Sequence, residues 1–263
     1  MKTINIAKLS WKPTTSDRMI LKEITCKLSA GNFYGILGPN GSGKTSLMRH
    51  LLRLLPVKAG KIQLDQKDIT RLKQEEFARL VSFVPQKTAI DAEFTVYDIV
   101  AMGRTPYQKH FQGLGKEDET IILQALEATK CIHLKDQYFT QLSGGEAQRV
   151  LVARTIAQDT PWLVLDEPIA SLDIKHQVDL MDTLRTLNRE KDKTVIAILH
   201  DLNLAAKYCN EIILMKDGEI YDAGPVEEVL TVKNLKAVYE IDFYMERNSH
   251  TGDRYFIPNS GGV

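Results

Sequence analysis

The most informative segment of the chain reads Gly38-Pro39-Asn40-Gly41-Ser42-Gly43-Lys44-Thr45. It satisfies the pattern G-x-x-x-x-G-K-[ST], in which glycines let backbone N–H groups turn inward around phosphates. A strand is predicted before it over 33–37, and a helix after it from Lys44 through Leu55, where Pro56 follows. A helix N-terminus adds positive dipole to the loop amides, so this arrangement predicts a nucleotide site.

The residue types predict the roles within this loop. Lys44 is expected to reach the β- and γ-phosphates, and Thr45 to place its hydroxyl on Mg²⁺. The residues expected to bind ATP here are Gly38, Pro39, Asn40, Gly41, Ser42, Gly43, Lys44, Thr45 and Ser46.

Two adjacent carboxylates, Asp166 and Glu167, follow the apolar run 162–165. Alone, such a pair is usually a solvated turn, but after a complete phosphate loop a catalytic role is favoured. Neighbouring strand residues point to opposite faces, so we expect Asp166 to face the metal held by Thr45. Glu167 is then expected to polarise the water that attacks the γ-phosphate.

The segment Leu142-Ser143-Gly144-Gly145-Glu146 precedes an amphipathic helix. Ser-Gly-Gly-Glu is an ordinary helix cap, but a serine and two glycine N–H groups at a helix start also form an anion site. With two phosphate-binding devices, the chain resembles the ATP-binding subunits of ABC transporters, whose signature is Leu-Ser-Gly-Gly-Glu. The resemblance implies ATP and Mg²⁺ as cofactors.

The same resemblance implies an α/β P-loop NTPase of the ABC ATPase fold, with an N-terminal antiparallel β-subdomain and an inserted helical subdomain. We expect one domain over 1–263. Its nucleotide-binding core would span about 1–90 and 160–225, with the helical subdomain at 91–159. A C-terminal helical extension and frayed tail would follow at 226–263.

Further family positions match one at a time. Gln86 matches the Q-loop glutamine, which touches the metal and the attacking water and lies where the transmembrane subunit docks. Asp173 matches the D-loop, His200 the histidine that senses the γ-phosphate, and Trp11 the aromatic residue that stacks on adenine, although a core role remains open for Trp11. The implied catalytic residues are therefore Glu167, His200, Gln86 and Lys44, and the implied metal ligands Thr45, Gln86 and Asp166.

In the family two copies pair head to tail, so each ATP would lie between one phosphate loop and the partner's signature, Ser143, Gly144, Gly145 and Glu146. ATP binding would close the pair, and hydrolysis would reopen it.

The charge balance and the hydropathy of the sequence limit the kinds of partner that we expect. Thirty-four basic residues offset thirty-four acidic ones, so no net field favours nucleic acid. The longest apolar run, 195–199, has five residues, whereas a membrane helix needs roughly 20. Neither a signal peptide nor a Cys-x-x-Cys pair is visible, which predicts a cytoplasmic protein.

The cargo is suggested by the tract Gly103-Arg104-Thr105-Pro106, which resembles importers of iron chelates, heme and cobalamin. This implies integral membrane permease subunits as partners, an extracytoplasmic substrate-binding protein acting indirectly, and a peripheral position on the cytoplasmic face of the membrane. Tyr97, Met102 and Tyr107 could line the groove for the permease, or could equally pack the helical subdomain.

Other functions remain open at this stage. They are an ABC system with another cargo, a phosphotransferase using the same loop, a DNA-repair or translation ABC protein, and a non-hydrolysing nucleotide-binding module. Three departures from the family pattern leave local turn geometry open: Ala147, Ile169-Ala170 and Asp65-Gln66, which lacks the usual glycine.

Overall fold

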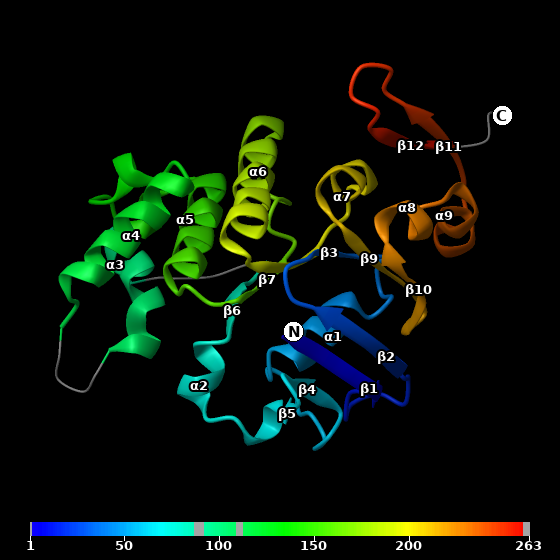
Figure 1. Ribbon diagram of the computed structural model, residues 1–263, viewed down its shortest axis with the longest axis horizontal. Coiled ribbons are helices and arrows are strands. Elements are labelled where there is room, and N and C mark those ends of the chain that lie inside the picture. Colours follow the sequence, from blue (N-terminus) through cyan, green and yellow to red (C-terminus); the bar gives the residue numbers. More distant parts are fainter. Residues whose placement is uncertain (1, 87–91, 109–112, 260–263) are drawn as a thin grey trace. The chain divides into compact units, whose positions relative to one another are not determined.

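A computed structural model describes residues 2–86, 92–108 and 113–259 of the protein (Figure 1). The chain divides into two compact units, Met1–Leu72 with Ile196–Val263, and Lys73–Val195. Within the described ranges, no helix has both the length and the apolar character needed to cross a membrane.

The first unit begins with the predicted antiparallel sheet, which the structure confirms. Its strands are β1 (Thr3–Trp11), β2 (Leu21–Ser29), β4 (Ile62–Leu64) and β5 (Lys67–Asp68), in the order β2-β1-β4-β5. Asp65 and Gln66 join β4 to β5 with φ angles of 49° and 66°. Both are left-handed, as a type I′ turn requires, so this turn forms without glycine.

A buried parallel pair carries the phosphate loop. Strand β3 (Phe33–Leu37) runs parallel to β9 (Glu211–Lys216), and β10 (Glu219–Pro225) pairs antiparallel with β9. All five residues of β3 are buried, which fits a strand covered on both faces. The loop leaves the carboxyl end of β3, where ligands of parallel sheets bind.

The helix after the loop, α1 (Lys44–Leu51), is shorter than predicted. Arg53 adopts a left-handed φ of 59°, and its N–H donates to the carbonyl of His50. The N–H of Leu54 donates to the carbonyl of Arg49. This pair of bonds is a Schellman motif, which ends a helix before any proline does. The predicted extension to Leu55 was therefore wrong.

The C-terminal part of the first unit contains helices and also a hairpin that the sequence analysis missed. The helices are α7 (Leu202–Tyr208), α8 (Val226–Val229) and α9 (Val232–Tyr239). Strands β11 (Asp242–Arg247) and β12 (Arg254–Asn259) then pair antiparallel. A purely helical extension is thus a correction, and residues 260–263 of the predicted tail lie outside the described residues.

The second unit contains another buried parallel pair. Strand β6 (Val81–Val84) runs parallel to β7 (Trp162–Asp166). Helix α2 (Gln74–Ala78) precedes β6, and α6 (Ile174–Lys191) follows β7. Strand β8 (Thr194–Ile198), also fully buried, contains the boundary between the units.

Between β6 and β7 the regular structure of the described residues is helical, as predicted for the inserted subdomain, apart from one isolated bridge between Thr95 and Tyr138. The helices are α3 (Val96–Ala101), η2 (Met102–Tyr107), α4 (Lys116–Ala128), η3 (Ile132–Leu134), η4 (Phe139–Gln141) and α5 (Gly144–Ala157).

Arg104, from the tract that suggested the cargo, lies in η2 and forms hydrogen bonds to α4 and α5. Its Nε donates to Asp118 Oδ1 on α4 at 2.8 Å, and its Nη1 donates to the Ala157 carbonyl at the end of α5 at 2.8 Å. The guanidinium also lies 4.2 Å from the centre of the Tyr107 ring. Arg104 is 7% exposed, so this tract has a structural role in the subdomain.

Gly103→Ala is expected to destabilise the protein by about 1–3 kcal/mol, the usual effect of overpacking. A Cβ at this position would lie 2.4 Å from the Arg154 carbonyl oxygen, which is backbone and cannot move aside easily. The urea midpoint measures the effect. Gly113→Ala is the matched control, because a Cβ there meets nothing within 4 Å. Equal midpoints for the two variants would contradict the prediction.

The Arg104–Asp118 pair should make stability depend on pH. The hydrogen bond from Arg104 lowers the pKa of Asp118 below its usual 3.8. A depressed carboxyl pKa stabilises the folded state above the unfolded-state pKa, and the effect is lost as pH falls through the folded value. Wild type should therefore exceed Asp118→Asn in stability by a constant amount above about pH 5, and the difference should shrink as pH falls below about 4 toward the folded value. Urea titrations at each pH test this, and a pH-independent difference would contradict it.

Candidate functional site

Lys44 lies against the first residues of the phosphate loop. Its ammonium donates to the carbonyl oxygens of Gly38 at 2.7 Å and Pro39 at 3.0 Å. The residue is only 6% exposed. The structure therefore brings the predicted phosphate-binding cation into the predicted loop.

The loop backbone fits an anion. Gly38, Gly41 and Gly43 have φ angles of 144°, 80° and 100°, in the region that favours glycine. A Cβ on Gly38 would lie 2.2 Å from the Met215 carbonyl oxygen, whereas one on Gly41 would meet nothing within 4 Å. Gly43 caps α1 without a side-chain hydrogen bond. The first N–H groups of α1 therefore have no capping side chain and suit a phosphate.

Gln86 and Glu167 come together in the second unit. Gln86 follows β6, Glu167 follows β7, and Gln86 Nε2 donates to Glu167 Oε2 at 2.6 Å. Glu167 has a left-handed φ of 50°. Since β7 ends at Asp166, a turn sets the direction of Glu167, and the expected alternation along the strand was the wrong reason for it. Asp166 itself is 5% exposed.

The signature segment caps α5. Ser143 Oγ and its N–H both donate to Glu146 Oε2, at 2.7 and 2.9 Å, and the Glu146 N–H donates back to Ser143 Oγ. These hydrogen bonds from Ser143 lower the pKa of Glu146. A Cβ on Gly144 would meet nothing within 4 Å. The capping box thus forms while the glycine stays open to a ligand.

Asp173 caps α6 beside the signature. Its Oδ1 accepts from the His176 N–H at 2.9 Å and lies 2.8 Å from His176 Nδ1. The backbone hydrogen bond from His176 is the main cause that lowers the pKa of Asp173. Gln177, which the sequence analysis missed, donates to the carbonyls of Ile169 at 3.2 Å and Leu172 at 3.0 Å. These bonds fix the loop that contains Asp173.

The signature and Asp173 share one hollow, in which three Lys or Arg side chains lie beside three carboxylates. Its lining residues are Lys130, His133, Ser143, Gly144, Gly145, Glu146, Arg149, Ser171, Asp173, Lys175, His176 and Asp179. No local sequence signal indicates this hollow, because it joins the turn after α4, η3, α5 and the start of α6.

His200 and Trp11 belong to the first unit. His200 is exposed and precedes Asp201, which caps α7. Trp11 ends β1 and meets His50 of α1 edge to face, with ring centroids 5.3 Å apart. Trp11 is half-buried, so its role toward adenine stays a prediction.

The residues expected to form the permease groove divide between packing and surface. Tyr107 packs beneath Arg104 and Arg79, at 4.2 and 5.4 Å from ring centre to guanidinium carbon. Met102 is 39% exposed, and Tyr97 is half-buried. The role of this set in docking stays a prediction.

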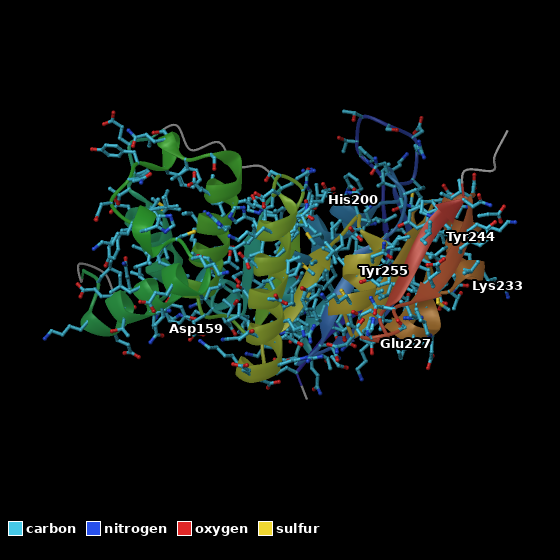
Figure 2. The ribbon with its side chains drawn as sticks, turned by 90° about the horizontal axis from the view of Figure 1, so that it is seen from above. Asp159, His200, Glu227, Lys233, Tyr244 and Tyr255 are labelled. Atoms are coloured by element: carbon cyan, nitrogen blue, oxygen red, sulfur yellow. The ribbon has the colours of Figure 1, made fainter. Side chains whose placement is uncertain are left out.

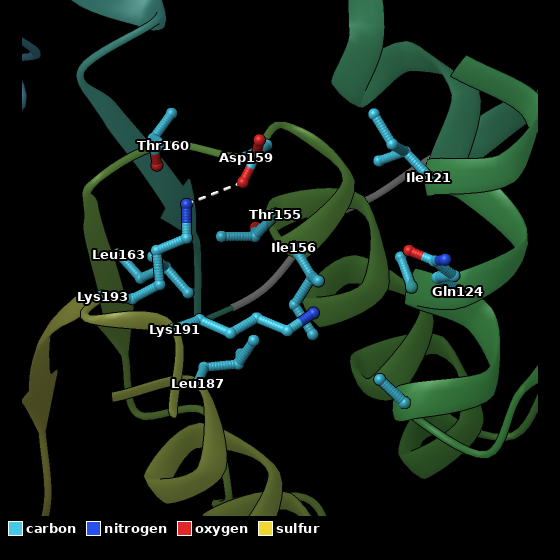
Figure 3. Close-up of a pocket in the computed structure, with 12 residues that line it drawn as sticks. Ile121, Gln124, Thr155, Ile156, Asp159, Thr160, Leu163, Leu187, Lys191 and Lys193 are labelled. Carbon is cyan, nitrogen blue, oxygen red and sulfur yellow. Dashed lines mark hydrogen bonds and ion pairs between the residues drawn. The ribbon is translucent and has the colours of Figure 1, made fainter. Parts of the chain in front are cut away.

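A separate pocket lies among α4, α5, α6 and β7 (Figure 3). Lys193 Nζ and Asp159 Oδ1 form an ion pair at 2.7 Å beside it, and Ile121, Ile156 and Leu187 contribute apolar walls. It contains no residue of the predicted site.

Comparison with known proteins identifies the family. Residues 21–170 match the family model described as ABC transporter. The ferric enterobactin transport ATP-binding protein FepC of Escherichia coli (strain K12) is 39% identical over 220 residues, covering 84% of this chain and 81% of that protein. The petrobactin import ATP-binding protein YclP of Bacillus subtilis (strain 168) is 37% identical over 225 residues, covering 85% and 88%.

Solved structures confirm the predicted α/β ABC ATPase fold. A chain from an inward-facing metal-chelate type ABC transporter matches with a TM-score of 0.84 at 26% identity, covering 98% of this chain and 97% of that one. A dimeric ATP-binding cassette in a post-hydrolysis state, bound to ADP and Pi, matches at 0.74 and 27%, covering 86% and 99%. With a family match over more than half of its length and relatives of similar size, the protein belongs to the ABC transporter family, as one of its ATPases.

Proposed function

We propose that this chain is the ATP-hydrolysing subunit of an importer for an iron chelate, a ferric siderophore or heme, or for cobalamin. The main support is the metal-chelate type transporter, which covers 98% of this chain, whereas the dimeric cassette covers 86%. The names of the relatives that transport enterobactin and petrobactin agree with this cargo class.

The proposed working form is a pair of identical chains on the cytoplasmic face of the membrane, bound to permease subunits and served indirectly by an extracytoplasmic substrate-binding protein. Each ATP would contact the phosphate loop of one copy and Ser143, Gly144 and Gly145 of the other. The open start of α5 in the hollow around the signature supports this arrangement, because N–H groups at a helix start suit a phosphate.

The role of each site residue is proposed from its residue type and from its match to the family. Lys44 neutralises phosphate charge, and Trp11 stacks on adenine. Glu167 orients the attacking water, and its contact with Gln86 supports a shared task for the two residues. His200 contacts the γ-phosphate. Asp173 lies in the hollow around the signature and positions that hollow.

Thr45, Gln86 and Asp166 would hold Mg²⁺ together with phosphate oxygens. The fit rests on donor chemistry, since hydroxyl, amide and carboxylate oxygens are the ligands this cation prefers. Mg²⁺ is usually bound by one or two carboxylates together with substrate phosphates and water. When bound, the ion would offset the charge on the β- and γ-phosphates.

An uptake assay tests the proposed cargo. Cells lacking this subunit would be complemented with wild type or with Glu167→Gln and supplied with labelled ferric siderophore, heme or cobalamin. Uptake of one of these only with wild type is the expected result. Equal uptake of all three by both strains would overturn the proposal.

A further inference from the structure

The C-terminal hairpin is firmly attached to helix α8. Arg254 of β12 is 9% exposed. Its guanidinium donates to the carbonyls of Leu230 at 3.1 Å and Val226 at 3.0 Å, and pairs with Glu227 at 3.1 Å. The Leu230 carbonyl follows the last residue of α8, where carbonyls lack partners within the helix, so these bonds fix the hairpin to the end of α8.

The hairpin also forms hydrogen bonds with helix α7. This helix begins just after His200. Asn203 Oδ1 accepts from the Phe256 N–H at 2.7 Å, and Asn203 Nδ2 donates to the Phe256 carbonyl at 3.5 Å. The N–H of Asn203 donates to Asp201 Oδ1, the cap of α7, at 2.7 Å. One side chain therefore links the backbone of the hairpin to the first turn that follows His200.

Aromatic packing also holds the hairpin against α9. Tyr239 is the last residue of α9, and burial raises its pKa to about 12. Its ring meets Phe243 of β11 edge to face, with centroids 6.1 Å apart. Phe243 and Phe256 are 6% and 3% exposed. The inner face of the hairpin is thus packed.

The outer face of the hairpin carries exposed side chains. Tyr244 and Tyr255, both labelled in Figure 2, are 59% and 40% exposed. The hairpin therefore contacts α7 through Asn203, while Tyr255 is available for a control substitution.

We propose that Asn203 is a positioning residue, through which the hairpin of β11 and β12 holds the His200 segment in the geometry needed for hydrolysis. This rests on the proposed role of His200. Asn203 acts on the backbone of the turn that follows His200, and displacement of a catalytic group by about 1 Å can lower a rate by about 10²-fold.

Steady-state ATPase assays on the full chain test this. Asn203→Ala should lower kcat at least about tenfold while KM for ATP changes less than about twofold, since α7 follows the histidine rather than the loop. Asn203→Asp keeps the oxygen that accepts from Phe256 and should recover most of kcat. Tyr255→Thr, on the outer face, is the control and should match wild type.

A double variant separates positioning from general destabilisation. Combining Asn203→Ala with His200→Ala should lower kcat no further than His200→Ala alone, because Asn203 acts through His200. Losses that multiply would overturn the inference. If Asn203→Ala does not fold, Asn203→Ser and Asn203→Asp are compared, and equal kcat values would overturn it.

His200→Ala also keeps this inference distinct from the proposed function. Wild-type turnover by His200→Ala would remove the proposed role of the histidine itself. Lost turnover in His200→Ala with wild-type turnover in Asn203→Ala would overturn the positioning role alone.

Discussion

Glu167→Gln is expected to bind ATP almost as wild type does and to lose turnover by about 10²–10⁴-fold, the usual contribution of a positioned general base. The amide has the same shape and still fits beside Gln86, whose Nε2 lies 2.6 Å from Glu167 Oε2. It cannot accept a proton from the attacking water. With the γ-phosphate retained, the variant should also accumulate as a nucleotide-bound dimer.

Single-turnover hydrolysis and size-exclusion chromatography with ATP measure these two effects. Glu127→Gln, an exposed position on α4, is the matched control. Hydrolysis by Glu167→Gln at the rate of that control would remove Glu167 from the proposed role.

Lys44→Ala is expected to lose ATP affinity as well as turnover, by about tenfold or more, since a charge-assisted hydrogen bond to phosphate is among the stronger polar contacts. The buried ammonium donates to two carbonyls of the loop, at 2.7 and 3.0 Å. Removing this side chain deletes the cation. It also deletes the two hydrogen bonds that hold the loop, so ATP binding should fail together with catalysis.

Fluorescent-nucleotide titration at constant ionic strength gives the affinity. Lys58→Ala, at an exposed position, controls for the loss of one positive charge. Wild-type affinity in Lys44→Ala would contradict the proposed role.

The sequence predicted those parts of the fold that depend on neighbours along the chain. The Gly-rich loop, the start of α1 at Lys44 and the continuously apolar run of β7 are local patterns, and the structure has all three. The end of α1 was not predictable, because the left-handed position is filled by Arg53 where glycine is usual.

The sequence predicted which residues would belong to the site. It did not predict how they are arranged in space. Gln86 was assigned by resemblance and Glu167 from the carboxylate pair after an apolar run. Their contact nevertheless joins positions 81 residues apart and depends on the pairing of β6 with β7. The hairpin was missed for a related reason: the inner-face residues Phe243 and Phe256 are single aromatics without a long apolar run. The side chain of Asn203 likewise bonds to Phe256, far away in the sequence, which no local pattern could reveal.

The left-handed backbone at Glu167 lowers thermal stability at a position where the side chain has a proposed catalytic role. A left-handed non-glycine residue is strained by about 1 kcal/mol or more, and φ here is 50°. Glycine at this point would relieve the strain while deleting the carboxylate. Laboratory evolution that rewarded thermal tolerance alone would tend to discard this residue, so screens for hardier variants of this chain need to score ATP turnover in parallel.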